Sequence, residues 1–134
     1  MERIKIVVRY ADGRVMKGYT QDFFPNKPQF HLFPAAAGPS GEAMTVLLKE
    51  LKGVFFVRDF EGNPQHHEQK KFAEGGHPSG RKMEVTFVDG EVLVGATMGY
   101  DPQRPGFFLS PADPETNNLR VFVVSAAVSK VRPL

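Results

Sequence analysis

The chain has 134 residues, 41% of them apolar, and its 17 Lys and Arg residues against 15 Asp and Glu residues give a formal net charge of +2. This length suits one compact domain or two very small ones, and a charge so close to neutral does not favour the basic patch of a strong nucleic-acid binder. The absence of cysteine excludes disulfides, thiolate metal sites and a cysteine nucleophile, and it fits the reducing cytoplasm, which is the expected location. No apolar run is long enough to span a bilayer, so no membrane partner is expected.

The first element expected along the chain is a β-hairpin. Apolar residues alternate with others over residues 4–10, which indicates a strand with one buried face. Asp12-Gly13 follows, and this dipeptide is typical of a two-residue type I′ turn. Such a turn would place Tyr10 opposite Val15 on the returning strand.

The same pattern returns later, because residues 5–54 align without a gap over residues 82–131 when the sequence is shifted by about 77 positions. In this second copy a type I′ turn would place Phe87 opposite Val92 and give the hairpin one wholly apolar face. That face would consist of Met83, Val85, Phe87, Val92, Val94, Ala96 and Met98.

Glycine and proline mark the bends of the repeated unit. Gly18 aligns with Gly95 inside the returning strand, where a repeated glycine indicates a sharp bend. Prolines then bound a short third strand in each copy and exclude a helix there. The aligned pairs are Pro25 and Pro102, Pro28 and Pro105, and Pro34 and Pro111.

Two further strands complete each copy. A fourth strand is expected at about residues 44–48 and 121–125, and a short turn then leads into a fifth. The fifth strand covers residues 54–60 in the first copy but only Val131 and Arg132 in the second. This asymmetry predicts that the last strand of the first copy packs against the second copy.

The pattern as a whole predicts an all-β protein with two pseudo-symmetric five-stranded units, at residues 1–60 and 81–134, and a flexible linker at residues 61–80. Histidines in the linker suggest a divalent metal as one alternative. Adjacent histidines on a flexible segment seldom converge, however, so a solvated linker is favoured and no metal or cofactor is expected. The residues concerned are His66, His67, Glu68 and His77.

A hairpin turn, a glycine in a bent second strand and a turn before the last strand resemble the Sm/Hfq type of small barrel and, more loosely, the SH3-like barrel. The resemblance is closest over residues 85–95, 106–109 and 121–131. It implies two Sm-like barrels, and in Sm proteins RNA is read after the second strand and before the fifth. The corresponding residues 100–103 and 124–127 lack the Arg-Gly and Tyr-Lys-His elements of those families, so RNA binding does not follow from the resemblance. The whole chain also looks like an uncharacterised bacterial domain family.

No Ser-His-Asp order, phosphate-binding loop or dinucleotide glycine pattern is present, so no enzyme is expected. Asp12 and Asp89 repeat because hairpin turns favour Asp. His31 aligns with Phe108, which favours packing or partial exposure over catalysis. A PilZ-like sensor of a nucleotide second messenger is a remote alternative, since the Arg-x-x-x-Arg arm and the Asp/Asn-x-Ser-x-x-Gly motif of that family are missing.

Two functions from different classes therefore remain. The first is a non-catalytic interaction or regulatory module that binds another protein, for example by strand addition at an exposed edge. The second is an Sm-like binder of RNA or single-stranded nucleic acid, in which aromatic rings stack on bases beside basic side chains. The candidate residues for such a surface are Tyr19, Phe23, Lys17, Lys27, Tyr100 and Arg104. The partner and the oligomeric state stay open.

Overall fold

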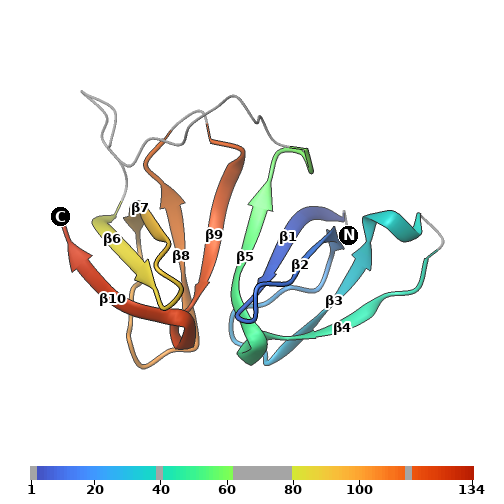
Figure 1. The fold of residues 1–134 in the computed structure, drawn as a ribbon, viewed down its shortest axis with the longest axis horizontal. Coiled ribbons are helices and arrows are strands. Elements are labelled where there is room, and N and C mark those ends of the chain that lie inside the picture. Colours follow the sequence, from blue (N-terminus) through green and yellow to red (C-terminus); the bar gives the residue numbers. More distant parts are fainter. Residues whose placement is uncertain (1–2, 39–40, 62–79, 114–115) are drawn as a thin grey trace.

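The computed structural model describes residues 3–38, 41–61, 80–113 and 116–134 and is built from ten β-strands (Figure 1). The strands are β1 (Ile4–Tyr10), β2 (Val15–Thr20), β3 (Gln29–Pro34), β4 (Met44–Leu47), β5 (Leu51–Val57), β6 (Arg81–Phe87), β7 (Val92–Thr97), β8 (Gly106–Pro111), β9 (Asn118–Val124) and β10 (Val128–Pro133). Single 3-10 turns are η1 (Ala35–Ala37), η2 (Leu48–Glu50) and η3 (Ser125–Ala127). Most of the expected linker, with His66, His67 and His77, lies outside the described residues. Within the described part, no helix has the length and apolar character needed to cross a membrane.

All ten strands form one antiparallel sheet in the order β10-β6-β7-β8-β9-β5-β1-β2-β3-β4. The all-β prediction is therefore confirmed. The first-half order β5-β1-β2-β3-β4 matches the second-half order β10-β6-β7-β8-β9 strand for strand. Two five-stranded barrels packed as a pair were expected, but the pairing gives one continuous sheet because β5 pairs with β1 on one side and with β9 on the other. The sheet is not closed, since β4 and β10 are its two ends.

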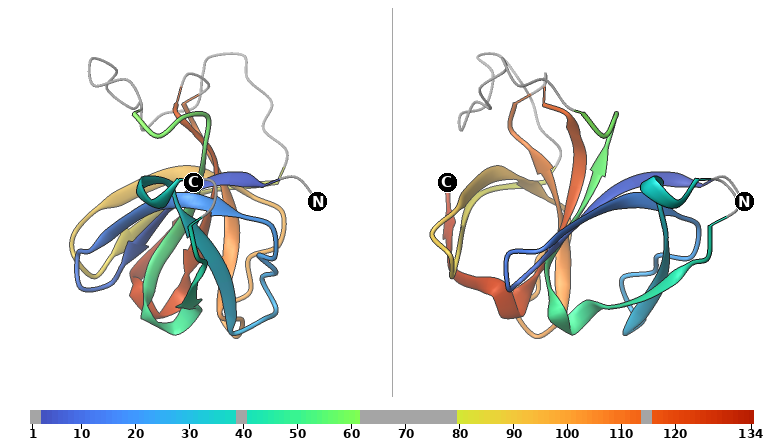
Figure 2. Two further views of the ribbon diagram at one scale, coloured as in Figure 1. Left: turned by 90° about the vertical axis from the view of Figure 1, so that its right-hand side faces the viewer. Right: turned by 45° about the vertical axis from the view of Figure 1, so that its right-hand side comes forward.

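The β5–β9 pair is the wall between two hydrophobic cores. It lies in the middle of the molecule (Figure 1), and the strands on either side curve away from it (Figure 2). All residues of β5 are buried. Val54 and Phe56 face one core with Phe122, whereas Phe55 faces the other core with Val123. Because successive residues of a strand point to opposite faces, this one pair contributes to both cores. The predicted contact of the first copy's last strand with the second copy is present, but the predicted difference in length is not, since β5 has 7 residues and β10 has 6.

The first hairpin has a longer loop than predicted. Arg9, rather than Tyr10, lies opposite Val15, while the Gly13 N–H donates to the Tyr10 carbonyl at 3.1 Å. The type I′ prediction is wrong, because that turn needs positive φ at both central residues, and in the described chain only glycines have positive φ, Gly13 among them at 98°. A type I turn followed by a left-handed glycine makes a three-residue loop, which shifts the register by one.

The second hairpin shows the same shift, with Thr86 rather than Phe87 opposite Val92. As a result the predicted apolar face is only partly realised. Leu93 is buried, whereas Met98, which was expected on that face, is 79% exposed. A one-residue change of register moves side chains to the other face of a strand, so the error in the turn explains the error in the face.

Gly18 and Gly95 let neighbouring strands approach closely. A Cβ atom at Gly95 would lie 2.3 Å from the backbone oxygen of Ser110, and one at Gly18 would lie 2.4 Å from that of Phe33. At these points β3 and β8 change neighbours. β8, for example, pairs with β9 over residues 106–109 and with β7 through Ser110 and Pro111. The repeated glycines therefore mark the points where β3 and β8 change neighbours.

Lys52 joins the two halves outside the β5–β9 pair. Its ammonium group lies 2.7 Å from Asp89 Oδ2, also donates to the Glu91 carboxylate, and sits 4.7 Å from the ring centre of Phe87. Lys52 is 8% exposed, whereas both carboxylates are well exposed at the β6–β7 hairpin. The hydrogen bond from Lys52, followed by the one from the Glu91 N–H, holds the pKa of Asp89 below its usual value of 3.8.

Replacing Gly95 should destabilise the protein. In the Gly95→Ala variant the new methyl group meets backbone atoms of β8, and overpacking of this kind costs about 1–3 kcal/mol. We expect a lower melting temperature by circular dichroism. The matched control is Gly99→Ala, because a Cβ at Gly99 meets nothing within 4 Å. Equal melting of both variants and the wild type would contradict the close approach of β7 and β8.

The Lys52 contact should make part of the stability depend on pH. A carboxylate whose pKa is lowered by folding stabilises the fold above its unfolded pKa, and this contribution is lost as the pH falls through the folded pKa. We therefore compare the free energies of unfolding of wild type and Lys52→Met, measured by urea titration at neutral pH and well below pH 3.8. The advantage of the wild type should be larger at neutral pH, by at most about 1 kcal/mol because Asp89 is exposed. Lys49→Met, at an exposed lysine in η2, should show no such change, and a difference for Lys52→Met that is constant with pH would argue against the contact.

Candidate functional site

The structure separates the predicted binding residues into distinct places. Lys17 and Tyr19 lie on β2 beside Phe60, where the Lys17 ammonium donates to the Phe60 carbonyl at 2.8 Å. The rings of Tyr19 and Phe60 pack edge to face at 5.3 Å. Both predicted residues are therefore engaged with the segment that follows β5.

Two of the predicted aromatic residues pack against other rings. Phe23 is partly buried against the first core and contacts the rings of Phe30 and Phe122 at 5.1 and 5.2 Å. Tyr100 packs on Phe107 at 4.8 Å. These contacts use the rings for packing, so the structure does not gather the aromatic residues into one stacking surface.

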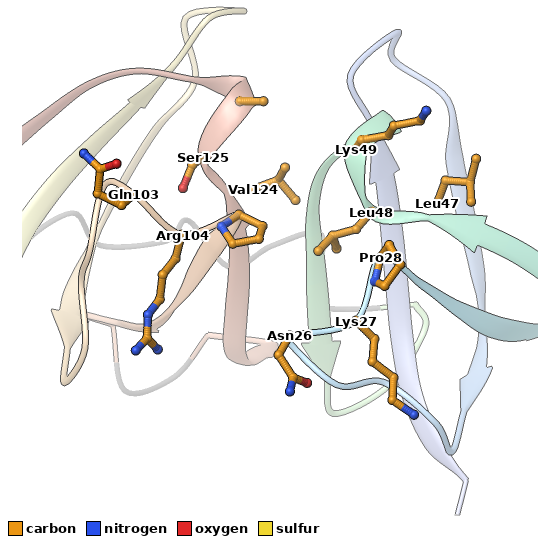
Figure 3. Close-up of a pocket in the computed structure, with 12 residues that line it drawn as sticks. Asn26, Lys27, Pro28, Leu47, Leu48, Lys49, Gln103, Arg104, Val124 and Ser125 are labelled. Atoms are coloured by element: carbon orange, nitrogen blue, oxygen red, sulfur yellow. The ribbon is translucent and has the colours of Figure 1, made fainter.

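Lys27 and Arg104 both line one cavity of about 690 Å³ between the two halves (Figure 3), and the Lys27 ammonium also lies 4.8 Å from the ring centre of Phe24. We call this cavity the junction pocket. Its lining consists of Asn26, Lys27, Pro28, Leu47, Leu48, Lys49, Gln103, Arg104, Pro105, Val124, Ser125 and Ala126. The loop before β3 contributes residues 26–28, and the loop before β8 contributes residues 103–105. The ends of β4 and β9, with η2 and η3, contribute the others.

The lining of the junction pocket has one sign of charge. Lys27, Lys49 and Arg104 line it, and no carboxylate is among the described lining residues. Arg104 has a neighbour outside the lining, Asp101, at 3.7 Å. The Ser125 hydroxyl is buried and makes no hydrogen bond to the described residues. An anion could accept hydrogen bonds from these groups without meeting a carboxylate in the wall.

Sequence reasoning identified Lys27 and Arg104 but missed the apolar wall and Ser125. A signal was available, because the lining segments 26–28 and 47–49 align with 103–105 and 124–126 in the shifted sequence. The repeat therefore pointed to the same places in both halves. It did not show that β5 and β9 pair, and that pairing is what brings these places together.

A second candidate site is the outer edge of β4. The Leu48 N–H donates to the Pro28 carbonyl at 2.9 Å, and hydrogen-bonded positions alternate along an antiparallel pair. In the register that sets Val46 opposite Phe30, Thr45 and Leu47 consequently direct their backbone groups toward the open side. β4 contains neither a charged residue nor a proline, which are the residues that usually protect an edge strand.

His31 and Asp22 lie next to this edge. His31 is opposite Thr45, and its ring Nδ1 is 2.6 Å from Asp22 Oδ2. The His31 N–H also donates to Asp22 at 2.9 Å. Burial by itself would raise the pKa of Asp22, but the hydrogen bonds from His31 outweigh it and bring this pKa below 3.8. The pair ties the segment after β2 to β3. Among the described residues, no group of three side chains suited to metal binding occurs.

The other end of the sheet differs from β4. β10 has a register irregularity between Val128 and Lys130, its Arg132 pairs with Glu84 at 2.9 Å, and Pro133 lacks an N–H. Bulges, charges and proline all hinder the addition of another strand. Of the two ends of the described sheet, β4 is therefore the unprotected one.

Removing the Ser125 hydroxyl should not destabilise the protein without ligand. A buried polar group that has no partner costs free energy, so Ser125→Ala should melt at or above the wild-type temperature. Ser129 provides the control because its hydroxyl donates to the Thr86 carbonyl at 3.1 Å, and Ser129→Ala should lose about 0.5–1.5 kcal/mol. A larger loss for Ser125→Ala than for Ser129→Ala would show that Ser125 is already satisfied.

Residues 2–134 match the model of a family described as a family of unknown function (DUF6982). Neither a curated protein nor a solved structure matches the chain. The match confirms the expectation of an uncharacterised domain family, and it adds nothing on the Sm/Hfq resemblance. Because it covers nearly the whole sequence, the chain belongs to the DUF6982 family.

Proposed function

We propose that this protein is a non-catalytic interaction module that binds another protein by adding an extended segment of that partner to the edge of β4. The observation that carries the proposal is a difference between aligned strands. β4 aligns with residues 121–124 of β9 in the shifted sequence, and β9 is covered by β5 whereas β4 is covered by no described strand. The partner segment would occupy beside β4 the position that β5 occupies beside β9.

The β5–β9 pair indicates what the partner segment must provide. β5 runs antiparallel to β9, with Val54 opposite Phe122. Beside β4, the same arrangement would set apolar side chains of the partner on the face of Val46, which is buried, and polar ones on the face of Thr45, which is exposed. An extended segment with alternating apolar and polar residues fits both faces, and its main chain would bond to Thr45 and Leu47.

The β10 strand of a second copy of this chain fits the edge less well than β5 fits β9. In β5, a Cβ at Gly53 would lie 3.0 Å from the backbone oxygen of Phe122, so glycine permits the approach of β5 to β9. The aligned residue of β10 is Lys130. Pro133, aligned with Phe56, also lacks the N–H that a ladder uses. These differences favour a strand from another protein over β10 of a second molecule.

The architecture behind this proposal is a duplication of an Sm-like or SH3-like unit. Its support is the gapless alignment of residues 5–54 with 82–131 and the equal strand order of the two halves. Binding of RNA or single-stranded nucleic acid through aromatic and basic side chains is the second candidate function. It has less support, because Phe23 and Tyr100 pack against other rings and Lys17 lies elsewhere than Lys27.

Strand addition can be tested with Thr45→Pro. Proline at this position removes an outward N–H and places its ring toward the incoming strand, and the N–H positions that face β3 are unchanged. Peptides long enough to form one strand would be selected from a random display library against the full chain and measured by anisotropy. We expect them to bind wild type and lose roughly tenfold or more in affinity with Thr45→Pro.

The matched control is Thr45→Val, which keeps the N–H and a branched side chain, so its affinity should stay near that of wild type. In the complex, amide hydrogen exchange should slow at Thr45 and Leu47. Selected peptides that bind Thr45→Pro as tightly as wild type would contradict the edge as the site. Failure to select any peptide, with oligonucleotide binding that weakens steeply with salt, would favour the nucleic-acid function.

A further inference from the structure

The junction pocket has the size and form of a ligand site, and of the two residues proposed to bond to an added strand, Thr45 and Leu47, only Leu47 lines it. Its volume of about 690 Å³ lies in the range of roughly 300–1,000 Å³ that is usual for sites that enclose small molecules. Both halves build it, through the aligned loops before β3 and β8 and the turns η2 and η3. A ligand in this pocket would contact both halves of the sheet at once.

We propose that the junction pocket binds a small amphipathic acid, with one carboxylate on an aliphatic body. The body of the ligand is inferred from the middle of the pocket, where Pro28, Leu48 and Val124 lie between the polar residues (Figure 3). No aromatic ring is among the described lining residues. Nucleotides are commonly held by stacking of the base on an aromatic ring, so an aliphatic body matches this wall better than a base does.

The carboxylate is inferred from the charged residues of the lining. Lys27 and Arg104 come from opposite halves, and their side chains extend toward the same side of the pocket (Figure 3). Asp101 lies 3.7 Å from Arg104, and both side chains are largely exposed, so this weak contact leaves the guanidinium able to take a second anion. A guanidinium binds a carboxylate through two parallel hydrogen bonds, and a lysine adds charge.

Ser125 adds a donor that the fold itself does not use. Its hydroxyl is buried at the pocket and makes no hydrogen bond to the described residues. The aligned residue of the first half, Leu48, is apolar. At this aligned pair of positions the second half therefore offers a hydroxyl where the first half offers an aliphatic side chain.

The proposal can be tested by a two-dimensional ¹H–¹⁵N NMR titration of the full chain with sodium octanoate, kept below its micelle concentration. We expect saturable shifts centred on the amides of Leu48, Val124 and Ser125. The double variant Lys27→Gln/Arg104→Gln should weaken binding by on the order of tenfold, whereas Lys17→Gln, far from the pocket, should leave it unchanged. Ala126→Trp fills the pocket from an exposed position, should keep the fold, and should abolish binding.

Several results would overturn the proposal. Shifts that are absent or spread over the whole chain would contradict binding in the junction pocket. Equal affinity for 1-octanol, or unchanged affinity in the double variant, would contradict recognition of a carboxylate. Tighter binding of adenosine monophosphate or inorganic phosphate would assign the pocket to phosphate chemistry instead. Thr45→Pro should bind octanoate like wild type, so failure of the pocket and failure of the β4 edge can be told apart.

Discussion

The pairing of β5 with β9 is the constraint on which the rest of the structure depends. It turns two five-stranded halves into one sheet and makes one pair of strands a wall for both cores. It also brings the loops before β3 and β8 to the same place, so the junction pocket is a consequence of the pairing. The Lys52 contact with the β6–β7 hairpin reinforces the same joint from outside. Burial of apolar residues on both faces of a strand gives such a joint most of its free energy.

Local features of the fold could be predicted from the sequence, and contacts between distant segments could be predicted only in part. Period-two alternation predicted the strands, and the aligned Gly18 and Gly95 predicted bends. Both signals are local. The register of the hairpins was wrong, since an Asp-Gly pair occurs in two-residue and three-residue loops alike and only the backbone angles separate them. The contact of the first copy's fifth strand with the second copy was expected from a difference in strand length that the structure does not show, and nothing local named β9 as the partner.

The candidate sites differ in how much of their chemistry the sequence carries. Lys27 and Arg104 are aligned basic residues beside aligned prolines, so the sequence could point to them. Ser125 could not be found in this way, because a hydroxyl becomes a candidate only when its surroundings bury it without a partner. The β4 edge is less visible still, since its functional groups are main-chain N–H and C=O groups that every strand possesses. The edge is defined by what other strands leave uncovered.

The difference between Gly53 and Lys130 has a consequence for how large the sheet can become. A unit whose fifth strand pairs with the fourth strand of the next could be repeated without limit, as in solenoid proteins, where terminal units must be modified to stop growth. Here one fifth strand permits the contact, through Gly53, and the other carries lysine at the aligned position. The two copies are thus not interchangeable: one acts as a connector and the other as a terminator. Divergence at aligned positions such as this one would limit self-addition through β10, while the β4 edge would remain open to the partner strand that we propose.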